Sequence, residues 1–477
     1  MKRIALALLV TGSITMAQNT KQAPPPPAAP KLFPFPTHAT KKLANGLTIY
    51  VIEDHRLPLV SYSLAVLAGS AQTPASKAGL ASLAGTLLRE GTAKRNSEEI
   101  SKLVDNAGGS LSTSGDRDST VVNATFMRSY ADLAMDLVAD VTRNPAFAQD
   151  EIERNLQQIQ SGLAVQYKDA EYLMTAVAFR AVLGVNPYSY PPEGTPESLH
   201  NLKREDLLGF HAKYFRPGNA FLAIAGDLKP AEAIALAEKY FGTWQAGGVQ
   251  HDKIPAVPNP VRQVLVIDLP NAVQTQIGVG QPGVVRSDPD YEALMVANEI
   301  FGGSFNSRVN MKLRASEGLT YGANSRAMSL RGAGTLGVTT FTRTEKTAEA
   351  VKAILTLFEE WLANPATDEE FTESQRHLLG SFGLSLETAD AVANRVVSTA
   401  INGLPEDYWS GWMGRIQGMT KEKVAAAVRK HVASGKLTVV AVGDSKEIAK
   451  SLEPFGPVTV IPVEKLDLLA GSLARGQ

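Results

Sequence analysis

The sequence lacks several groups on which enzymes commonly depend. Cysteine is absent from its 477 residues, which excludes disulfide bonds, thiolate metal sites and a thiol nucleophile. The few histidines are His38, His55, His200, His211, His251, His377 and His431. No two of them are spaced to share one helix face, so the chain has no HxxxH pair for a metal. It also has no GxSxG motif and no Walker-type phosphate loop.

Charge is balanced, and this bears on the partners to be expected. The net charge is −1, with 20% charged and 44% hydrophobic residues, as in ordinary globular proteins. Nothing in this balance attracts the whole chain to nucleic acid or to anionic lipid, so nucleic acid is not expected as a partner. The length is too great for one ordinary core and predicts several domains.

The first residues have the pattern of a targeting segment. Lys2 and Arg3 precede the apolar run Ile4–Val10, which gives way to small residues up to Ala17. We expect residues 1–17 to be a secretory signal peptide, which implies export, most simply to a bacterial periplasm. A transmembrane anchor is the alternative, but the run is shorter than the roughly 20 apolar residues that a bilayer requires. No stable membrane anchor is therefore expected.

A proline-rich segment follows. Residues 18–37 include four consecutive prolines at Pro24–Pro27, surrounded by alanine. Such a segment favours an extended chain over a packed core, so we expect a tether, with the folded part beginning near His38.

The rest of the chain consists of two similar halves. Residues 202–227 match residues 419–444 at a constant offset of 217, so that Gly226 meets Gly443 and Asp227 meets Asp444. A self-similarity of this length indicates a duplicated domain rather than a solenoid, whose repeats are much shorter.

Domain boundaries follow from this duplication. We expect an N-terminal domain at 38–245, a glycine- and proline-rich linker at 246–262 and a C-terminal domain at 263–470. Apolar runs typical of strands are interspersed with groups of helical periodicity in both halves. The predicted fold class is α+β, with two homologous domains, each a mainly antiparallel sheet covered by helices.

The stretch Phe301–Tyr321 in the second half contains the candidate site residues. Arg314 and Tyr321 lie seven residues apart in it, and a glycine pair, Gly302 and Gly303, opens it. Taken alone, the arginine is typical of an exposed salt bridge and the tyrosine of a half-buried strand. The glycines either end a helix or allow close approach of a bound peptide backbone, and we weigh the two interpretations equally.

Three passages together resemble a known family. They are AGLASLAGTLLREGT at Ala78–Thr92, the strand end Gly226-Asp227, and FGGSFNSRVNMKLRASEGLTYGANS from Phe301 onward. They are similar to the insulinase/pitrilysin zinc metallopeptidases, and in particular to the branch of mitochondrial processing peptidase and its bacterial relatives. The resemblance runs from about His38 to Leu468 and implies a fold of two similar α+β domains.

The metal site that this resemblance implies is degenerate here. Active members carry HxxEH on the helix matched by the first passage, where two histidines hold zinc and the glutamate acts as a base. Ser82, Gly85 and Thr86 stand at the histidine, glutamate and histidine positions, and the third ligand falls near Ser161 and Gly162. We therefore expect this chain to bind no metal cofactor, and the zinc to be held by a partner subunit.

The second half keeps its part of the pattern. The resemblance implies that Arg314 and Tyr321 hold the substrate backbone and stabilise the charge on the attacked carbonyl, with Gly302 and Gly303 binding substrate. The predicted function is the non-catalytic subunit of a heterodimeric peptidase that cleaves peptides or unfolded polypeptides, with a homologous partner that carries HxxEH. The chain alone is not expected to be a peptidase.

Three alternatives remain open at this point. The chain is an inactive scaffold of the same fold, a homodimeric peptide-binding protein of the periplasm, or an enzyme with unrecognised metal ligands.

Overall fold

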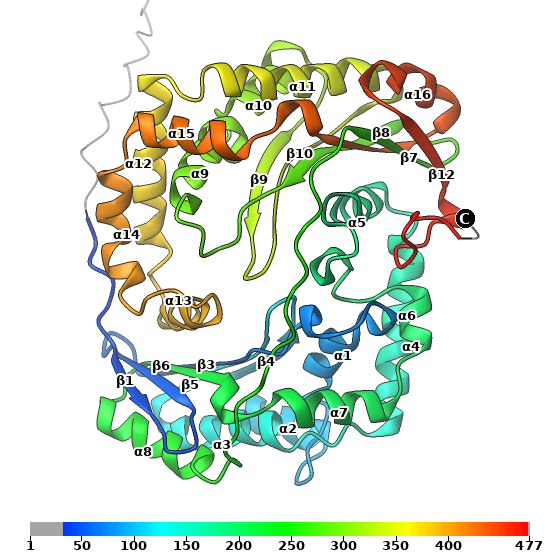
Figure 1. Ribbon diagram of the computed structural model, residues 1–477. Coiled ribbons are helices and arrows are strands. Elements are labelled where there is room, and N and C mark those ends of the chain that lie inside the picture. Colours follow the sequence, from blue (N-terminus) through cyan, green and yellow to red (C-terminus); the bar gives the residue numbers. More distant parts are fainter. Residues whose placement is uncertain (1–31, 476–477) are drawn as a thin grey trace, which may run out of the picture.

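A computed structural model of the chain describes residues 32–475. The predicted signal peptide at 1–17 and residues 18–31 of the predicted tether lie outside the described residues. Across the described range, no helix combines the length and apolar character needed to cross a bilayer. The chain forms two six-stranded sheets, with helices around both (Figure 1).

Both sheets have the same plan. Sheet 1 runs in the order β1 (Ala39–Lys42), β2 (Thr48–Glu53), β6 (Ala220–Gly226), β3 (Leu59–Val66), β5 (Thr120–Met127), β4 (Ser110–Gly115). Sheet 2 runs in the order β12 (Val458–Pro462), β7 (Gln263–Asp268), β11 (Thr438–Gly443), β8 (Gln274–Pro282), β10 (Gly334–Arg343), β9 (Ala323–Ser329). Most neighbours are antiparallel, but β2 pairs with β6, and β7 with both β11 and β12, in parallel. The predicted α+β class is confirmed, with sheets that are mixed rather than wholly antiparallel.

The duplication is visible element by element. Helix α7 (Arg204–Tyr214) and helix α15 (Lys421–His431) have matching bounds at the offset of 217, and each leads into a central strand, β6 or β11. Strands β6 and β11 occupy the same place in the two sheet orders.

Helices cover the outer face of each sheet. The outer helices of sheet 1 are α1 (Leu80–Leu87), α2 (Ser97–Asn106), α3 (Ala131–Arg143), α7 and α8 (Pro230–Phe241). Those of sheet 2 include α9 (Tyr291–Asn298), α11 (Thr347–Ala363), α15 and α16 (Ser445–Leu452). Alternate strand residues point to these helices, so that each half has a two-layer core.

The inner faces are covered by exchanged helices. Helix α5 (Ala170–Leu183) comes from the first half but packs on β8 and β11 of sheet 2. Helix α13 (Ala389–Ile401) comes from the second half and packs on β3 and β6 of sheet 1. Figure 1 shows both helices on the faces that the two sheets turn toward each other. Each half therefore completes the core of the other, and the folded unit is the whole chain.

The described end of the predicted tether is packed. Phe35 is only 6% exposed and its ring stacks on Trp409 of α14 (Tyr408–Gln417), with ring centroids 6.5 Å apart. Phe33 lies against Gly383 of α12 (Asp368–Leu384). The packed chain thus begins before His38, because aromatic side chains among the prolines bind to the second half.

Two further helices complete the first half. They are α4 (Gln149–Gln166) and the short α6 (Pro196–His200). Only α6 was not indicated by the sequence patterns.

Candidate functional site

The segment that carries Arg314 is built from two π-helical turns. Helix α9 ends in one, Glu299–Gly303, and the short α10 (Arg308–Asn310) continues into the other, Met311–Ser316. A π turn inserts an extra residue into the helical ladder and is frequently found at functional sites. Each of the two helices that flank Gly302 and Gly303 thus ends in an irregular turn.

Buried side chains hold one face of this segment. Phe301 stacks on Trp361 of α11, with ring centroids 4.1 Å apart, and also contacts Phe358 at 4.8 Å. Val309 and Leu313 are fully buried in the same core. Because these anchors occupy the inward face, Phe305, Met311 and Arg314 lie on the exposed face.

Close packing leaves no room for a side chain at either residue of the glycine pair. A Cβ on Gly302 would lie 2.4 Å from Oγ of Ser325 on β9, and one on Gly303 would lie 2.8 Å from Oε2 of Glu299. The Ser325 hydroxyl in turn donates to Oδ1 of Asn298, at 2.8 Å. Glycine therefore allows the first π turn to lie directly against β9, which fixes the position of the segment that follows.

An ion pair holds the second turn to α12. The guanidinium of Arg308 donates to both carboxylate oxygens of Glu370, at 2.7 and 2.6 Å, and to the carbonyl of Asn364 at 2.6 Å. Burial raises the pKa of Glu370, but the hydrogen bonds from Arg308 and from the backbone of Thr367 outweigh this and lower the pKa to about 2. The carboxylate is therefore ionised over the whole physiological pH range, and the ion pair with Arg308 is not lost by protonation.

Arg314 and Tyr321 are both available to another molecule. The Arg314 guanidinium lies over the ring of Phe305, 4.9 Å from its centroid, and makes no ion pair within residues 32–475. Phe305 is 68% exposed and Tyr321 is 84% exposed. Neither the salt bridge nor the half-buried strand tyrosine weighed above is observed.

A groove connects several of the predicted site residues. It has a volume of about 470 Å³ and is lined by Arg314, Gly302 and Gly303 together with Glu171 and Met174 of α5. The structure thus brings the arginine and the glycine pair to one surface. Glu171 and Met174 were not predicted, because they lie more than a hundred residues earlier and no local pattern marks a helix that crosses to the other half.

Tyr321 stands beside this groove rather than in it. The neighbouring Gly322 lines the groove, whereas Tyr321 does not. Its phenol projects into solvent from the short segment between the second π turn and β9.

Helix α1, which matches the family's zinc-binding helix, leaves no room for the glutamate that acts as the base. On α1, a Cβ on Gly85 would lie 2.3 Å from the backbone nitrogen of Gly115, because β4 lies directly against the helix. The Thr86 hydroxyl donates to the carbonyl of Ser82, at 3.1 Å, and so is bound within its own helix. A glutamate at position 85 would collide with the strand backbone.

The third-ligand positions fit no better. Ser161 and Gly162 are exposed on α4, and the Ser161 hydroxyl donates to the carbonyl of Gln157, at 2.8 Å. Neither residue offers a carboxylate or an imidazole, so the residues present do not form the family's zinc site.

One other group of potential ligands lies in the described part of the chain. Asp288, Asp290 and His431 have ligand atoms within 4.8 Å of one another. However, the ammonium of Lys430 lies 2.6 Å from Oδ2 of Asp290, and hydrogen bonds from Lys430 and His431 lower the pKa of that carboxyl. Since a fixed cation already neutralises it, we interpret the group as an ion-pair cluster.

Comparison with known proteins agrees with this geometry. Residues 48–190 match the family model described as insulinase (peptidase family M16), and residues 201–378 match the one described as peptidase M16 inactive domain. A protein of Helicobacter pylori named "non-peptidase homolog YmxG" is 23% identical over 412 residues, which cover 86% of this chain and 95% of that protein. An uncharacterized zinc protease of Mycobacterium leprae is 28% identical over 367 residues, covering 76% and 81%.

Solved structures show the same fold. A structure titled as a peptidase M16 inactive domain, from Pseudomonas fluorescens, superposes with a TM-score of 0.80 at 27% identity, covering 85% of this chain and 98% of that one. The structure of a protease from Helicobacter pylori superposes with a TM-score of 0.79 at 19% identity, covering 85% and 99%. The two matched segments and the shared fold lead to one conclusion: the chain belongs to the insulinase (M16) peptidase family, with other residues at the positions of the family's zinc ligands.

Proposed function

We propose that this protein is the non-catalytic, substrate-binding subunit of a heterodimeric M16 peptidase. The observation that carries the proposal is an asymmetry between the two halves. The zinc helix of the first half is closed by β4, whereas Arg314 in the second half is exposed, unpaired within residues 32–475, and held at a groove by rigid packing. The first half thus lacks the zinc-binding residues, whereas the second half presents an arginine for a substrate. This combination suits a chain that completes the active site of a partner.

In this proposal Arg314 binds the substrate of the partner. A guanidinium is always charged and donates several hydrogen bonds in a fixed plane, which suits a peptide carbonyl on which negative charge develops. Tyr321 adds a phenol donor beside it. The partner is a homologous chain with HxxEH, which would supply the zinc, and the substrates are peptides or unfolded polypeptides.

Export belongs to the same proposal. The pattern at residues 1–17 supports secretion, and we place the complex in the bacterial periplasm.

A second candidate is an inactive scaffold or a peptide-binding protein of the same fold. The name of the Helicobacter relative, a non-peptidase homolog, favours it. In that case Arg314 would have no role in hydrolysis.

Reconstitution separates the two. The mature chain is produced alone and with an HxxEH-bearing homologue from the same genome, and cleavage of a quenched fluorescent peptide is measured. We expect activity only in the mixture, a decrease of about 10²-fold in kcat with Arg314→Ala, and a smaller decrease with Tyr321→Phe. Arg429→Ala is the matched control, because Arg429 is an exposed arginine on α15, on the outer side of sheet 2.

Two outcomes contradict the proposal. One is a mixture no more active than the homologue alone, and the other is full activity of the Arg314→Ala mixture. Either result assigns the chain to the scaffold or peptide-binding class.

A further inference from the structure

A second cavity adjoins the Arg314 groove under helix α5. It has a volume of about 270 Å³ and lies between α5 and the inner face of sheet 2. It shares Glu171, Met174, Asn324 and Thr339 with the lining of the Arg314 groove. The two therefore form one continuous trough, which we call the α5 trough. The cavity is slightly smaller than the roughly 300–1,000 Å³ of small-molecule sites, a size suited to a single side chain.

Three glycines on the sheet side of the cavity leave part of its floor without side chains. Gly278 and Gly280 lie on β8, and Gly337 of β10 is the register partner of Gly280. A Cβ on Gly278 would lie 2.6 Å from Sδ of Met174, so the methionine side chain of α5 occupies the space that this glycine leaves. Glycine within a strand commonly marks a place where a ligand or another backbone approaches closely.

The first half shows that this gap is not imposed by the fold. There, Ser63 of β3 pairs with Ala223 of β6, as Gly278 pairs with Val440. The Ser63 hydroxyl donates to Oδ1 of Asn394 on α13, at 2.8 Å, and Ala223 is fully buried. At this position of sheet 1 a direct hydrogen bond thus joins strand and helix, whereas at the equivalent position of sheet 2 a cavity separates them.

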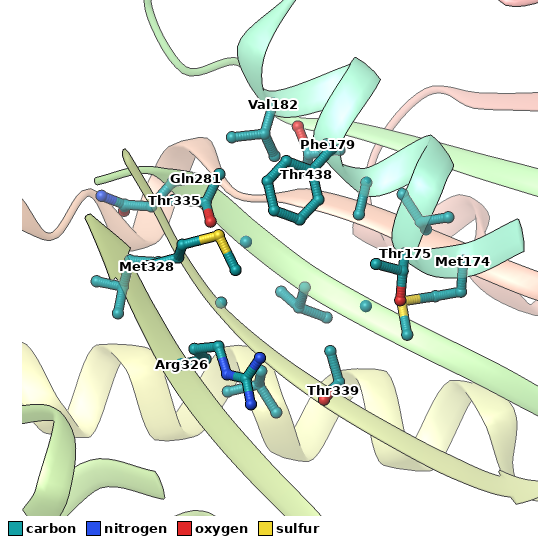
Figure 2. Close-up of a pocket in the computed structure, with 18 of the residues that line it drawn as sticks. Met174, Thr175, Phe179, Val182, Gln281, Arg326, Met328, Thr335, Thr339 and Thr438 are labelled. Atoms are coloured by element: carbon teal, nitrogen blue, oxygen red, sulfur yellow. The ribbon is translucent and has the colours of Figure 1, made fainter. Parts of the chain in front are cut away.

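The walls are apolar and adaptable. Figure 2 shows Phe179 and Val182 extending from α5 over the strands, and Met328 reaching in from β9 on the opposite side. Met174 lies further along α5. Methionine side chains are flexible and polarizable, so a lining of this kind accepts apolar groups of different shapes.

The charge at the trough is positive. Arg326 of β9 lines the cavity and Arg314 lines the adjoining groove, and neither makes an ion pair within the described residues. Glu171 is the one carboxylate that lines either part. The trough therefore favours an extended peptide that carries an acidic side chain next to an apolar one.

The geometry points to a specificity pocket in the α5 trough: the cavity binds one apolar side chain of an extended peptide, and Arg326 binds an acidic residue next to it. This inference rests on the proposed function and names the substrate class, polypeptides with an aromatic or aliphatic residue beside an aspartate or glutamate. The peptide backbone would continue along the groove toward Arg314. Methionine in the wall predicts that phenylalanine, leucine and methionine are all accepted.

Binding to this chain alone tests the inference without a partner. The probe is a fluorescein-labelled heptapeptide with a central phenylalanine followed by an aspartate, measured by fluorescence anisotropy with the full-length mature chain. We expect a Kd below about 1 mM. A peptide with alanine in place of phenylalanine is expected to bind about tenfold more weakly or worse, because an apolar side chain is then no longer buried. A peptide with lysine in place of aspartate is also expected to bind more weakly.

Two variants locate the site. Ala178→Phe fills the cavity from α5 and is expected to remove the preference for phenylalanine over alanine. Arg326→Glu, at an exposed residue, is expected to reverse the preference for aspartate over lysine, so the test does not depend on how Ala178→Phe folds. Lys352→Glu is the matched control, since Lys352 is exposed on α11, on the other side of sheet 2, and should leave both preferences unchanged. Thermal melts verify that each variant is folded.

The inference is overturned if the probe does not bind, or if both variants bind all three peptides as the unmodified chain does. Because no partner takes part, such a failure is distinct from failure of the reconstitution, which tests the proposed function separately.

Discussion

Substitution of Gly85 tests whether the zinc helix is closed as the structure indicates. Alanine at a helix interior position is ordinarily more stable than glycine by about 1 kcal/mol. Here the new Cβ would lie 2.3 Å from the Gly115 nitrogen and 2.6 Å from the Ser114 carbonyl carbon, whereas ordinary contact begins at 3.4 Å. Helix α1 would have to move by about 1 Å from β4, against backbone that cannot rotate away.

The net effect follows from these two terms. Overpacking of this kind costs about 1–3 kcal/mol, and backbone neighbours place Gly85→Ala at the upper end. After the gain in helix propensity, we expect a loss of about 2 kcal/mol in the free energy of unfolding. Gly162→Ala on α4 is the matched control, because no atom lies within 4 Å of its added Cβ, and it should stabilise the protein by up to about 1 kcal/mol.

The assay is urea unfolding monitored by circular dichroism. The two variants should shift the midpoint in opposite directions. A Gly85→Ala chain as stable as the unmodified one would refute the close contact between α1 and β4. The same contact implies that restoring the motif with Ser82→His, Gly85→Glu and Thr86→His yields no stoichiometric zinc by metal analysis, and a full complement of zinc would contradict it.

Two further predictions concern stability. Glu370→Gln should lower the free energy of unfolding by about 1–2 kcal/mol at pH 7, allowing for solvent screening of the Arg308 pair. Since the folded pKa of about 2 lies below the reference value of 4.5, this contribution is complete above pH 4.5 and disappears as the pH falls toward 2; a variant with the same acid dependence as the unmodified chain would argue against the clamp. Phe35→Ala should cost about 3 kcal/mol, because the ring is buried against Trp409. Leu57→Ala at an exposed loop position should cost little, and equal midpoints for these two variants in urea would show that the segment before His38 is not part of the core.

Much of the fold was accessible from the sequence because its signals are local. The offset of 217 places α7 and α15, and with them β6 and β11, in equivalent positions, as the structure confirms. Such elements depend on residues close in sequence, which is why periodicity is sufficient to find them.

The candidate site was accessible only in part. Arg314, Tyr321 and the glycine pair were named from one continuous segment and its family resemblance. The role of Gly302 against Ser325, and the π turns on either side, depend on contacts between elements, which spacing does not report. The wall of the groove formed by Glu171 and Met174 could not be predicted, because helix α5 reaches the groove from the other half.

The sequence by itself determined that the chain is duplicated, that it has α+β halves and that it lacks the residues of a zinc site. These properties lie in residue identities and in their periodic order. The tertiary structure alone decided that α5 and α13 are exchanged between the halves, that β4 closes the altered zinc helix and that a cavity remains beneath α5. The physical reason is that an apolar helix face shows that the helix is buried, whereas which sheet buries it depends on the shape of surfaces formed by distant parts of the chain.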